Sequence, residues 1–338
     1  MFTEKLRKIT RQEDLDAAET AQMIDEIFSG SLTDAQIGAF MAALATKGET
    51  YEELAGAATA MRRKALRIET PASTIVDTCG TGGDGAKTFN ISTTTAFVVA
   101  GAGVTVAKHG NRSISSQCGS ADLLEALGMN LNLDPELVEE AVTDIGVGFL
   151  FAPKYHGAMR YAAAARKDVA IRSIFNMLGP LTNPAAANCQ VLGVYAPELT
   201  EMFARALQKL GSRRVFVVHG HDGLDEISVC APTRISELND GLIQTYDISP
   251  EQFFGEPADP EALTGGDPKE NADITLKILG GEKGPRRDVV LINSAAALVA
   301  AGKAEKLADG ISVAAYAIDS GAARDKLDAL IAFTRENA

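Results

Sequence analysis

A glycine-rich stretch at residues 80–85 has the residue types and spacing that could bind an anionic ligand. Four of its six residues are glycine, and it follows a short apolar run at 74–76 that is typical of a buried strand. Glycine allows the backbone to turn sharply and present its N–H groups to a ligand. After Asn90 the chain becomes apolar, with Ser92 or Thr93 placed to cap a helix. A strand, a glycine loop and a helix N-terminus together predict a phosphate site.

Two common phosphate-binding motifs fit this stretch only in part. Gly80, Gly82 and Gly85 match G-x-G-x-x-G, but residues 100–108 contain no acid to bind a ribose as in dinucleotide-binding proteins. The P-loop spacing also occurs, but Ala86 stands where that motif requires lysine. Asp84 would repel a phosphate unless it meets sugar hydroxyls or a bridging cation. The stretch hints at a sugar phosphate bound with a metal ion, and a tight turn without a ligand is the alternative.

Further polar groups follow other predicted strands. Residues 108–112, Lys-His-Gly-Asn-Arg, come just beyond a strand at 104–107, at the sheet edge where open α/β folds bind ligands. Asp225 and Glu226 follow a strand at 215–219, and magnesium is commonly held by one or two carboxylates together with substrate phosphates. Adjacent acids can equally mark a solvated turn. Arg166, on a predicted helix, suits a second substrate that carries a carboxylate.

The elements that would position these residues fall into two groups. Residues 1 to about 70 predict helices, with a break at Gly30 and a new start at Thr33. From Pro71 strands and helices alternate, which predicts an α/β fold with a mainly parallel sheet flanked by helices. Two helical pieces at 155–167 and 173–178 interrupt this alternation, and we expect them to pack on the N-terminal helices. Later β-structure is expected at 233–238 and 242–247, with helices from Pro268 onward.

Composition excludes several classes of function. The 338 residues suggest about two domains, and the net charge of −13 disfavours binding to nucleic acid or to anionic membranes. Apolar runs stay short of the roughly 18 residues of a membrane helix, and the N-terminus lacks the core of a signal peptide. The four cysteines have no metal-site spacing, so a reduced, cytoplasmic protein is expected.

Taken together, the motifs resemble those of the anthranilate phosphoribosyltransferases. The resemblance spans nearly the whole chain in order, and it rests on residues 80–84, 90–93, 108–111, 119–128, 172–183, 225–226, 266–272 and 293–297. It implies transfer of a phosphoribosyl group from phosphoribosyl pyrophosphate to anthranilate in tryptophan biosynthesis, with Mg²⁺ at two sites. It also implies a homodimer formed by a small all-helical domain, made of 1–70 with about 155–184, beside a large α/β domain made of 71–154 and 185–338.

The resemblance also assigns site residues. Contacts to phosphoribosyl pyrophosphate fall on Gly80, Gly83, Asp84, Thr88, Asn90, Ile91, Ser92, Thr93, Lys108, His109, Gly110, Asn111, Arg112, Ser113, Ser116 and Ser120. Contacts to anthranilate fall on Gly80, His109, Asn111 and Arg166, and magnesium on Ser92, Asp225 and Glu226. The catalytic group is Lys108, Asp84, Asp225 and Glu226.

Two other functions share the implied fold. A pyrimidine nucleoside phosphorylase would transfer a glycosyl group to phosphate, but its expected Lys-His-Ser-Thr glycine loop is absent, since Cys79 precedes Gly80 here. A non-catalytic nucleic-acid-binding relative should have a basic groove, which the net charge of −13 disfavours.

Overall fold

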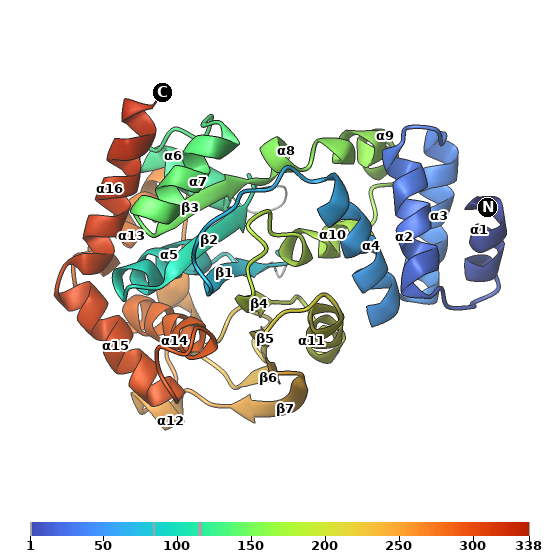
Figure 1. Ribbon diagram of the computed structural model, residues 1–338. Helices are drawn as coiled ribbons and strands as arrows, with labels where there is room; N and C mark the ends of the chain where they lie inside the picture. Colours follow the sequence, from blue (N-terminus) through green and yellow to red (C-terminus); the bar gives the residue numbers. More distant parts are fainter. Residues whose placement is uncertain (1, 84, 114–116, 338) are drawn as a thin grey trace.

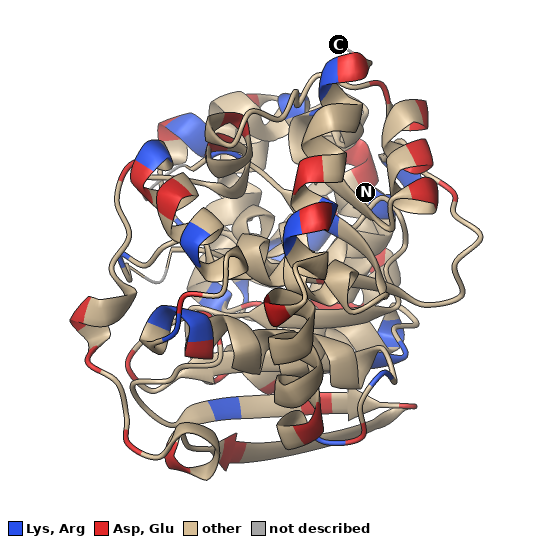
Figure 2. Cartoon of the chain, turned by 90° about the vertical axis from the view of Figure 1, so that its left-hand side faces the viewer, with Lys and Arg blue, Asp and Glu red and all other residues tan. Residues whose placement is uncertain are grey.

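Helices at both ends of the chain enclose one central sheet in the computed structural model, which describes residues 2–83, 85–113 and 117–337. The N-terminal helices lie to one side of the sheet and the C-terminal helices to the other (Figure 1). Within the described residues, no helix has the length and apolar character needed to span a bilayer. Acidic and basic residues are interspersed over the face seen in Figure 2.

The N-terminal helices are α1 (Phe2–Thr10), α2 (Ala17–Phe28), α3 (Asp34–Lys47) and α4 (Tyr51–Lys64). Three of them begin with a capping box, in which the cap side chain and the third helical residue satisfy each other's backbone N–H groups. Thr33 caps α3, as the sequence predicts, and Gly48 ends it. The fourth helix, α4, ends at Lys64.

The sheet has seven strands in the order β3-β2-β1-β4-β5-β6-β7. The strands are β1 (Ile75–Gly80), β2 (Thr105–Gly110), β3 (Val147–Phe151), β4 (Cys189–Gly193), β5 (Arg214–Gly220), β6 (Thr233–Asn239) and β7 (Leu242–Ile248). The first five are parallel, and β6 and β7 join as an antiparallel hairpin at one edge. The predicted mainly parallel sheet is confirmed.

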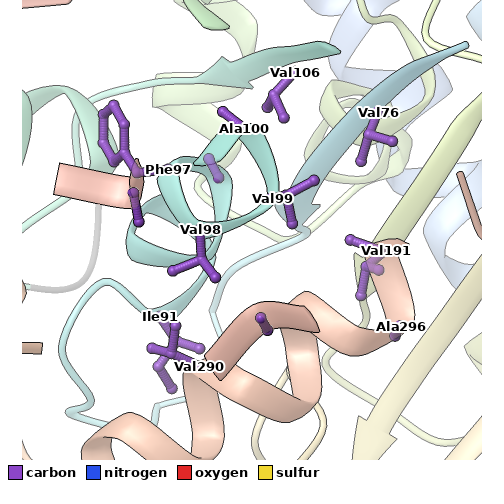
Figure 3. Close-up of a cluster of buried hydrophobic side chains, with 14 of the residues drawn as sticks. Val76, Ile91, Phe97, Val98, Val99, Ala100, Val106, Val191, Val290 and Ala296 are labelled. Atoms are coloured by element: carbon purple, nitrogen blue, oxygen red, sulfur yellow. The ribbon is translucent and has the colours of Figure 1, made fainter. Parts of the chain in front are cut away.

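One face of the sheet is covered by α5 (Ile91–Gly101) and by the C-terminal helices α14 (Pro285–Ala300), α15 (Leu307–Asp319) and α16 (Ala322–Glu336). Val98 and Val99 of α5 lie among Val76 of β1, Val191 of β4 and Val290 of α14 (Figure 3). This core fixes the N-terminus of α5 beside the end of β1, because burial of these apolar side chains stabilises the contact.

The remaining helical elements connect the strands or close the chain. They are α6 (Ser120–Ala126), α7 (Pro135–Asp144), α8 (Ala152–Tyr155), η1 (Gly157–Met159), α9 (Arg160–Val169), α10 (Ile174–Met177), η2 (Gly179–Leu181), α11 (Leu199–Lys209), α12 (Glu251–Phe254), η3 (Pro260–Leu263) and α13 (Pro268–Leu279). Ala162 and Ala165 of α9 and Phe175 of α10 join the buried cluster of the N-terminal helices. The expected packing of these two pieces is therefore observed.

Three local predictions are wrong. The helix expected at 155–167 is divided, because His156 leaves helical geometry between α8 and η1, and α9 begins only at Arg160. Neither Ser92 nor Thr93 caps α5, which starts at Ile91 after Asn90. Residues 108–110 lie inside β2 and not beyond it, because the strand continues its pairing with β3 as far as Gly110.

Candidate active site

The glycine loop leaves the carboxyl end of β1 at Gly80. Gly82, Gly83 and Gly85 have φ values of 65°, 75° and 74°, a left-handed region that residues with a Cβ rarely adopt. The backbone N–H of Gly82 donates to Asp225 Oδ2 at 3.0 Å, and a Cβ on Gly80 would lie 2.5 Å from the same oxygen. The loop therefore has the backbone geometry that the sequence predicts, and it packs directly on the acidic turn. Asp84 lies outside the described residues.

Lys108 extends from β2 to the space between the end of β1 and the start of α5. Its ammonium group donates to Thr78 O and to Ser92 Oγ, the latter at 3.3 Å. The residue is only 4% exposed, and burial lowers the pKa of its ammonium group while the nearby Asp77 carboxylate opposes the shift. The structure thus brings Lys108, Ser92 and the glycine loop to one sheet edge.

Asp77 lies beneath this edge and organises it. Its carboxylate accepts hydrogen bonds from the backbone N–H of His109 at 3.1 Å and from Asn183 Nδ2 at 2.8 Å. Asn183 also donates to Ala107 O at 2.8 Å, so one amide joins β1 and β2 to the segment that follows η2. Burial raises the pKa of the Asp77 carboxyl, and the charge of Lys108 opposes that shift.

Two buried histidines form a hydrogen-bonded pair next to Asp77. His109 Nδ1 lies 3.0 Å from Gly179 O, and since a carbonyl only accepts, this nitrogen carries the proton. His109 Nε2 then accepts from His156 Nε2 at 3.2 Å. Burial lowers the pKa of His109 to about 3, with His156 adding to the effect, and burial lowers the pKa of His156 to about 4. Both imidazoles are neutral at pH 7.

The pair predicts a loss of stability in mild acid. An unfolded histidine has a pKa of about 6.5, so below that pH the unfolded chain binds protons that the folded pair does not. Lowering the pH from 7.5 to 5 should therefore cost about 2 kcal/mol of unfolding free energy for each histidine. Urea unfolding measures this loss: between pH 7.5 and 5, the unfolding free energy of His156→Gln should fall by about 2 kcal/mol less than that of the wild type. The exposed His221→Gln serves as control; equal losses in all three proteins would contradict the assignment.

The turn that carries Asp225 and Glu226 is fixed by glycine and asparagine. A Cβ on Gly193, at the end of β4, would overlap the carbonyl of Asp225, so only glycine permits this approach. Asn293 of α14 accepts from the backbone N–H of Ile227 at 3.0 Å and donates to its carbonyl at 2.9 Å. Both acidic residues are half-buried next to the glycine loop. The predicted acidic pair thus lies at the predicted edge.

The start of α5 is held from the C-terminal part of the chain. Asn271 of α13 donates to Asn90 Oδ1 at 3.0 Å, and Asn90 donates to Cys118 O at 3.0 Å. Thr88 forms an isolated β-bridge with Thr264. Ile91 and Thr93 are buried in α5 behind these contacts, so they support the site from within the helix.

The loop after β2 is held by an ionic cluster. Arg112 forms ion pairs with Glu125 and with Asp122, the latter at 3.0 Å, and these raise the pKa of the guanidinium and lower the pKa of the Glu125 carboxyl. The pKa of the Asp122 carboxyl is lowered against its burial by the backbone N–H groups of Ser113 and Gly119 and then by Arg112. The backbone N–H of Ser113 donates to Asp122 Oδ2 at 3.0 Å. Ser120, the first residue of α6, donates to Asn111 O at 3.1 Å, next to Gly110. Ser116 lies outside the described residues.

Arg166 lies on α9. It is half-buried, and its guanidinium carbon lies 5.9 Å from the ring centroid of Phe175 in α10. This contact joins Arg166 to α10, on the helical side of the molecule.

Several residues of the site carried no assigned role in the sequence analysis. They are Asp77, His156, Arg172, Asn183, Asn271 and Asn293. Asp77 offered a signal, because a carboxylate inside an apolar strand needs buried partners. The other side chains find their partners through tertiary contacts far apart in the sequence.

Comparison with known proteins supports a class for this fold and site. Two family models match, the glycosyl transferase family helical bundle domain at residues 3–65 and the glycosyl transferase family a/b domain at residues 72–324. The two matches together place the chain in the glycosyl transferase family.

Individual relatives narrow the class. The anthranilate phosphoribosyltransferase of Desulfosudis oleivorans is 69% identical over 338 residues and covers 100% of both chains. The crystal structure of the Thermus thermophilus enzyme of that name superposes with a TM-score of 0.92 at 42% identity, covering 98% of this chain and 99% of the other. The Saccharomyces cerevisiae enzyme in complex with PRPP and Mg gives a TM-score of 0.90 at 29% identity, covering 99% and 98%. The chain belongs to the anthranilate phosphoribosyltransferase family.

Proposed function

We propose that the chain transfers the phosphoribosyl group of 5-phosphoribosyl 1-pyrophosphate (PRPP) to the amine of anthranilate, in tryptophan biosynthesis. The products are N-(5-phosphoribosyl)anthranilate and pyrophosphate. The observation that carries the proposal is the convergence of the glycine loop, Lys108 and the acidic turn at one sheet edge. This convergence occurs in a chain that shares 69% identity with a relative of that name.

The residues present fit magnesium. Ser92 Oγ and the carboxylates of Asp225 and Glu226 are hard oxygen donors, the type that Mg²⁺ takes together with substrate phosphates. We assign one ion near Ser92 and another to the two acids; when bound, they would neutralise charge on the departing diphosphate. Within the described part of the chain no group of three or more His, Cys, Asp or Glu side chains could hold a metal alone. The substrate would therefore complete both sites.

The chain's own residues act by position and charge. The Thr81 and Gly82 N–H groups donate to Gly193 O and Asp225, so the diphosphate would bind the other backbone N–H groups of the glycine loop. The buried Lys108 ammonium adds positive charge next to it. Asn111 and Arg166 orient anthranilate, whose amine is already neutral near pH 7. His109 is neutral, and both its ring nitrogens are bonded within the protein, to Gly179 O and to His156, so this histidine supplies no strong base.

An assay of anthranilate fluorescence tests the function. Purified protein with PRPP should consume anthranilate when Mg²⁺ is present and stop when the ion is chelated. Parallel reactions with uridine and phosphate test for a pyrimidine nucleoside phosphorylase, and binding titrations with nucleic acid test for a nucleic-acid-binding protein of the same fold. Folded protein that cleaves uridine, or that leaves anthranilate unconsumed, would overturn the proposal.

Arg166→Ala should weaken the use of anthranilate selectively. A guanidinium binds a carboxylate through two hydrogen bonds, and a charged pair of this kind contributes about 2–3 kcal/mol. We therefore expect KM for anthranilate to rise about 30–150-fold while KM for PRPP stays within about 3-fold. Steady-state kinetics with each substrate varied in turn measures both; equal effects on the two substrates would contradict the role.

The proposal includes the assembly, the domain division and the compartment. Residues 1–70 with about 155–184 would form the small domain, and this domain would mediate a homodimer. Light scattering coupled to gel filtration measures the dimer directly. A cytoplasmic location agrees with the thiols of Cys79, Cys189 and Cys230, which form no disulfide and therefore suit a reducing compartment.

A further inference from the structure

Arg172 reaches from the helical side of the molecule to the glycine loop. It lies between α9 and α10, and its Nη2 donates to the carbonyl of Gly83 at 2.9 Å. A Cβ on Gly83 would overlap this guanidinium nitrogen, so the side chain of Arg172 packs directly against the backbone of Gly83. The loop is thus held at two adjacent residues, at the Gly82 N–H by Asp225 and at the Gly83 carbonyl by Arg172.

The guanidinium itself is oriented by an aromatic ring. Its central carbon lies 3.7 Å from the ring centroid of Tyr195, which follows β4. The Tyr195 hydroxyl contacts Met177 Sδ at 4.0 Å, and Met177 of α10 is buried. Stacking on a ring fixes the plane of a guanidinium and therefore the direction of its N–H groups. Although Arg172 is exposed, the stacking on Tyr195 therefore fixes the direction of its hydrogen bond to the loop.

We propose that Arg172 is a positioning residue that sets the glycine loop for diphosphate binding, an inference that rests on the proposed function. Glycines with positive φ leave the loop free to turn its peptide groups. A carbonyl oxygen turned toward the diphosphate would repel it, whereas Arg172 keeps the Gly83 oxygen engaged elsewhere. Because Arg172 belongs to the segment between α9 and α10, the geometry of that segment is coupled to the affinity for PRPP.

Calorimetric titration of PRPP with Mg²⁺ tests this role without turnover. Arg172→Ala should raise the Kd about 10-fold, since the free loop then spends most of its time in unproductive conformations. Arg172→Lys should bind PRPP nearly as weakly as Arg172→Ala. Lysine retains the charge, but it lacks the planar guanidinium that stacks on a ring and directs its N–H groups. Tyr195→Ala should weaken binding in part, and the double variant should be no weaker than Arg172→Ala alone. Arg205→Ala removes another exposed arginine near a tyrosine, Tyr51, and should leave the Kd unchanged.

Three results would overturn the role of Arg172. They are an unchanged Kd in Arg172→Ala, full affinity in Arg172→Lys, or a flatter dependence of Kd on salt concentration in Arg172→Ala. The last two would indicate a direct contact between the charge and a phosphate. Wild-type protein that binds PRPP and consumes anthranilate keeps the proposed function intact in each case, so the two failures are distinguishable.

Discussion

Lys108→Met is expected to lower kcat by about 10²–10³-fold, the usual cost of removing one preorganised charge or donor from the group that stabilises a leaving anion. The ammonium group is buried between β1 and α5 and donates to Ser92 Oγ, so water replaces its charge poorly. KM for anthranilate should change little, because we assign the lysine to the diphosphate. Single-turnover kinetics with saturating substrates measures the effect on chemistry.

A matched variant separates catalysis from stability. Lys47 has a side chain only 3% exposed and forms ion pairs with Asp14 and Glu53 in the N-terminal helices. Lys47→Met should destabilise the fold by about 3–5 kcal/mol, as the loss of one partner of a buried ion pair does, yet leave kcat unchanged. A comparable loss of kcat in both folded variants would show that Lys108 acts only through stability.

Asp225→Asn is expected to lower kcat/KM by about 10²-fold and to raise the Mg²⁺ concentration for half-activation at least 10-fold. Asparagine can still accept the hydrogen bond from the Gly82 N–H, so the loop keeps its support. The variant removes the negative charge, which is the larger part of the attraction for a divalent cation. Activity measured over a magnesium series, with PRPP held constant, gives both quantities.

Asp222→Asn is the control for this charge. Asp222 lies three residues earlier in the same loop, and its carboxylate accepts a hydrogen bond from Ser228 Oγ at 2.6 Å, which an amide oxygen can also accept. The half-activating Mg²⁺ concentration should therefore stay at the wild-type value. If both variants raise the half-activating Mg²⁺ concentration equally, the overall negative charge of the loop, and not coordination by Asp225, determines the affinity for Mg²⁺.

The sequence predicts the parallel sheet, the glycine loop and the acidic turn because each depends on local pattern. The alternation of strands and helices defined the sheet, and the glycines at 82, 83 and 85 indeed have positive φ. Strand ends were predicted less well: β2 runs on to Gly110 through polar residues, because pairing with β3 outweighs the local change in polarity.

The supporting contacts could not be predicted, because their partners lie far apart in the sequence. His109 and His156 are separated by 47 residues, and Asn90 and Asn271 by 181. Arg172 contacts a loop 89 residues earlier. Each contact depends on how α13, the segment after β3 and the link between α9 and α10 pack around the sheet, which hydrophobic periodicity alone does not specify.

A crystal structure of this protein with PRPP and Mg²⁺ tests the central claim most directly. The account predicts the diphosphate on the backbone N–H groups of the glycine loop, with Lys108 beside it and magnesium on Asp225 and Glu226. A fully occupied PRPP molecule whose diphosphate lies away from residues 80–83, with that loop unoccupied, would contradict the account.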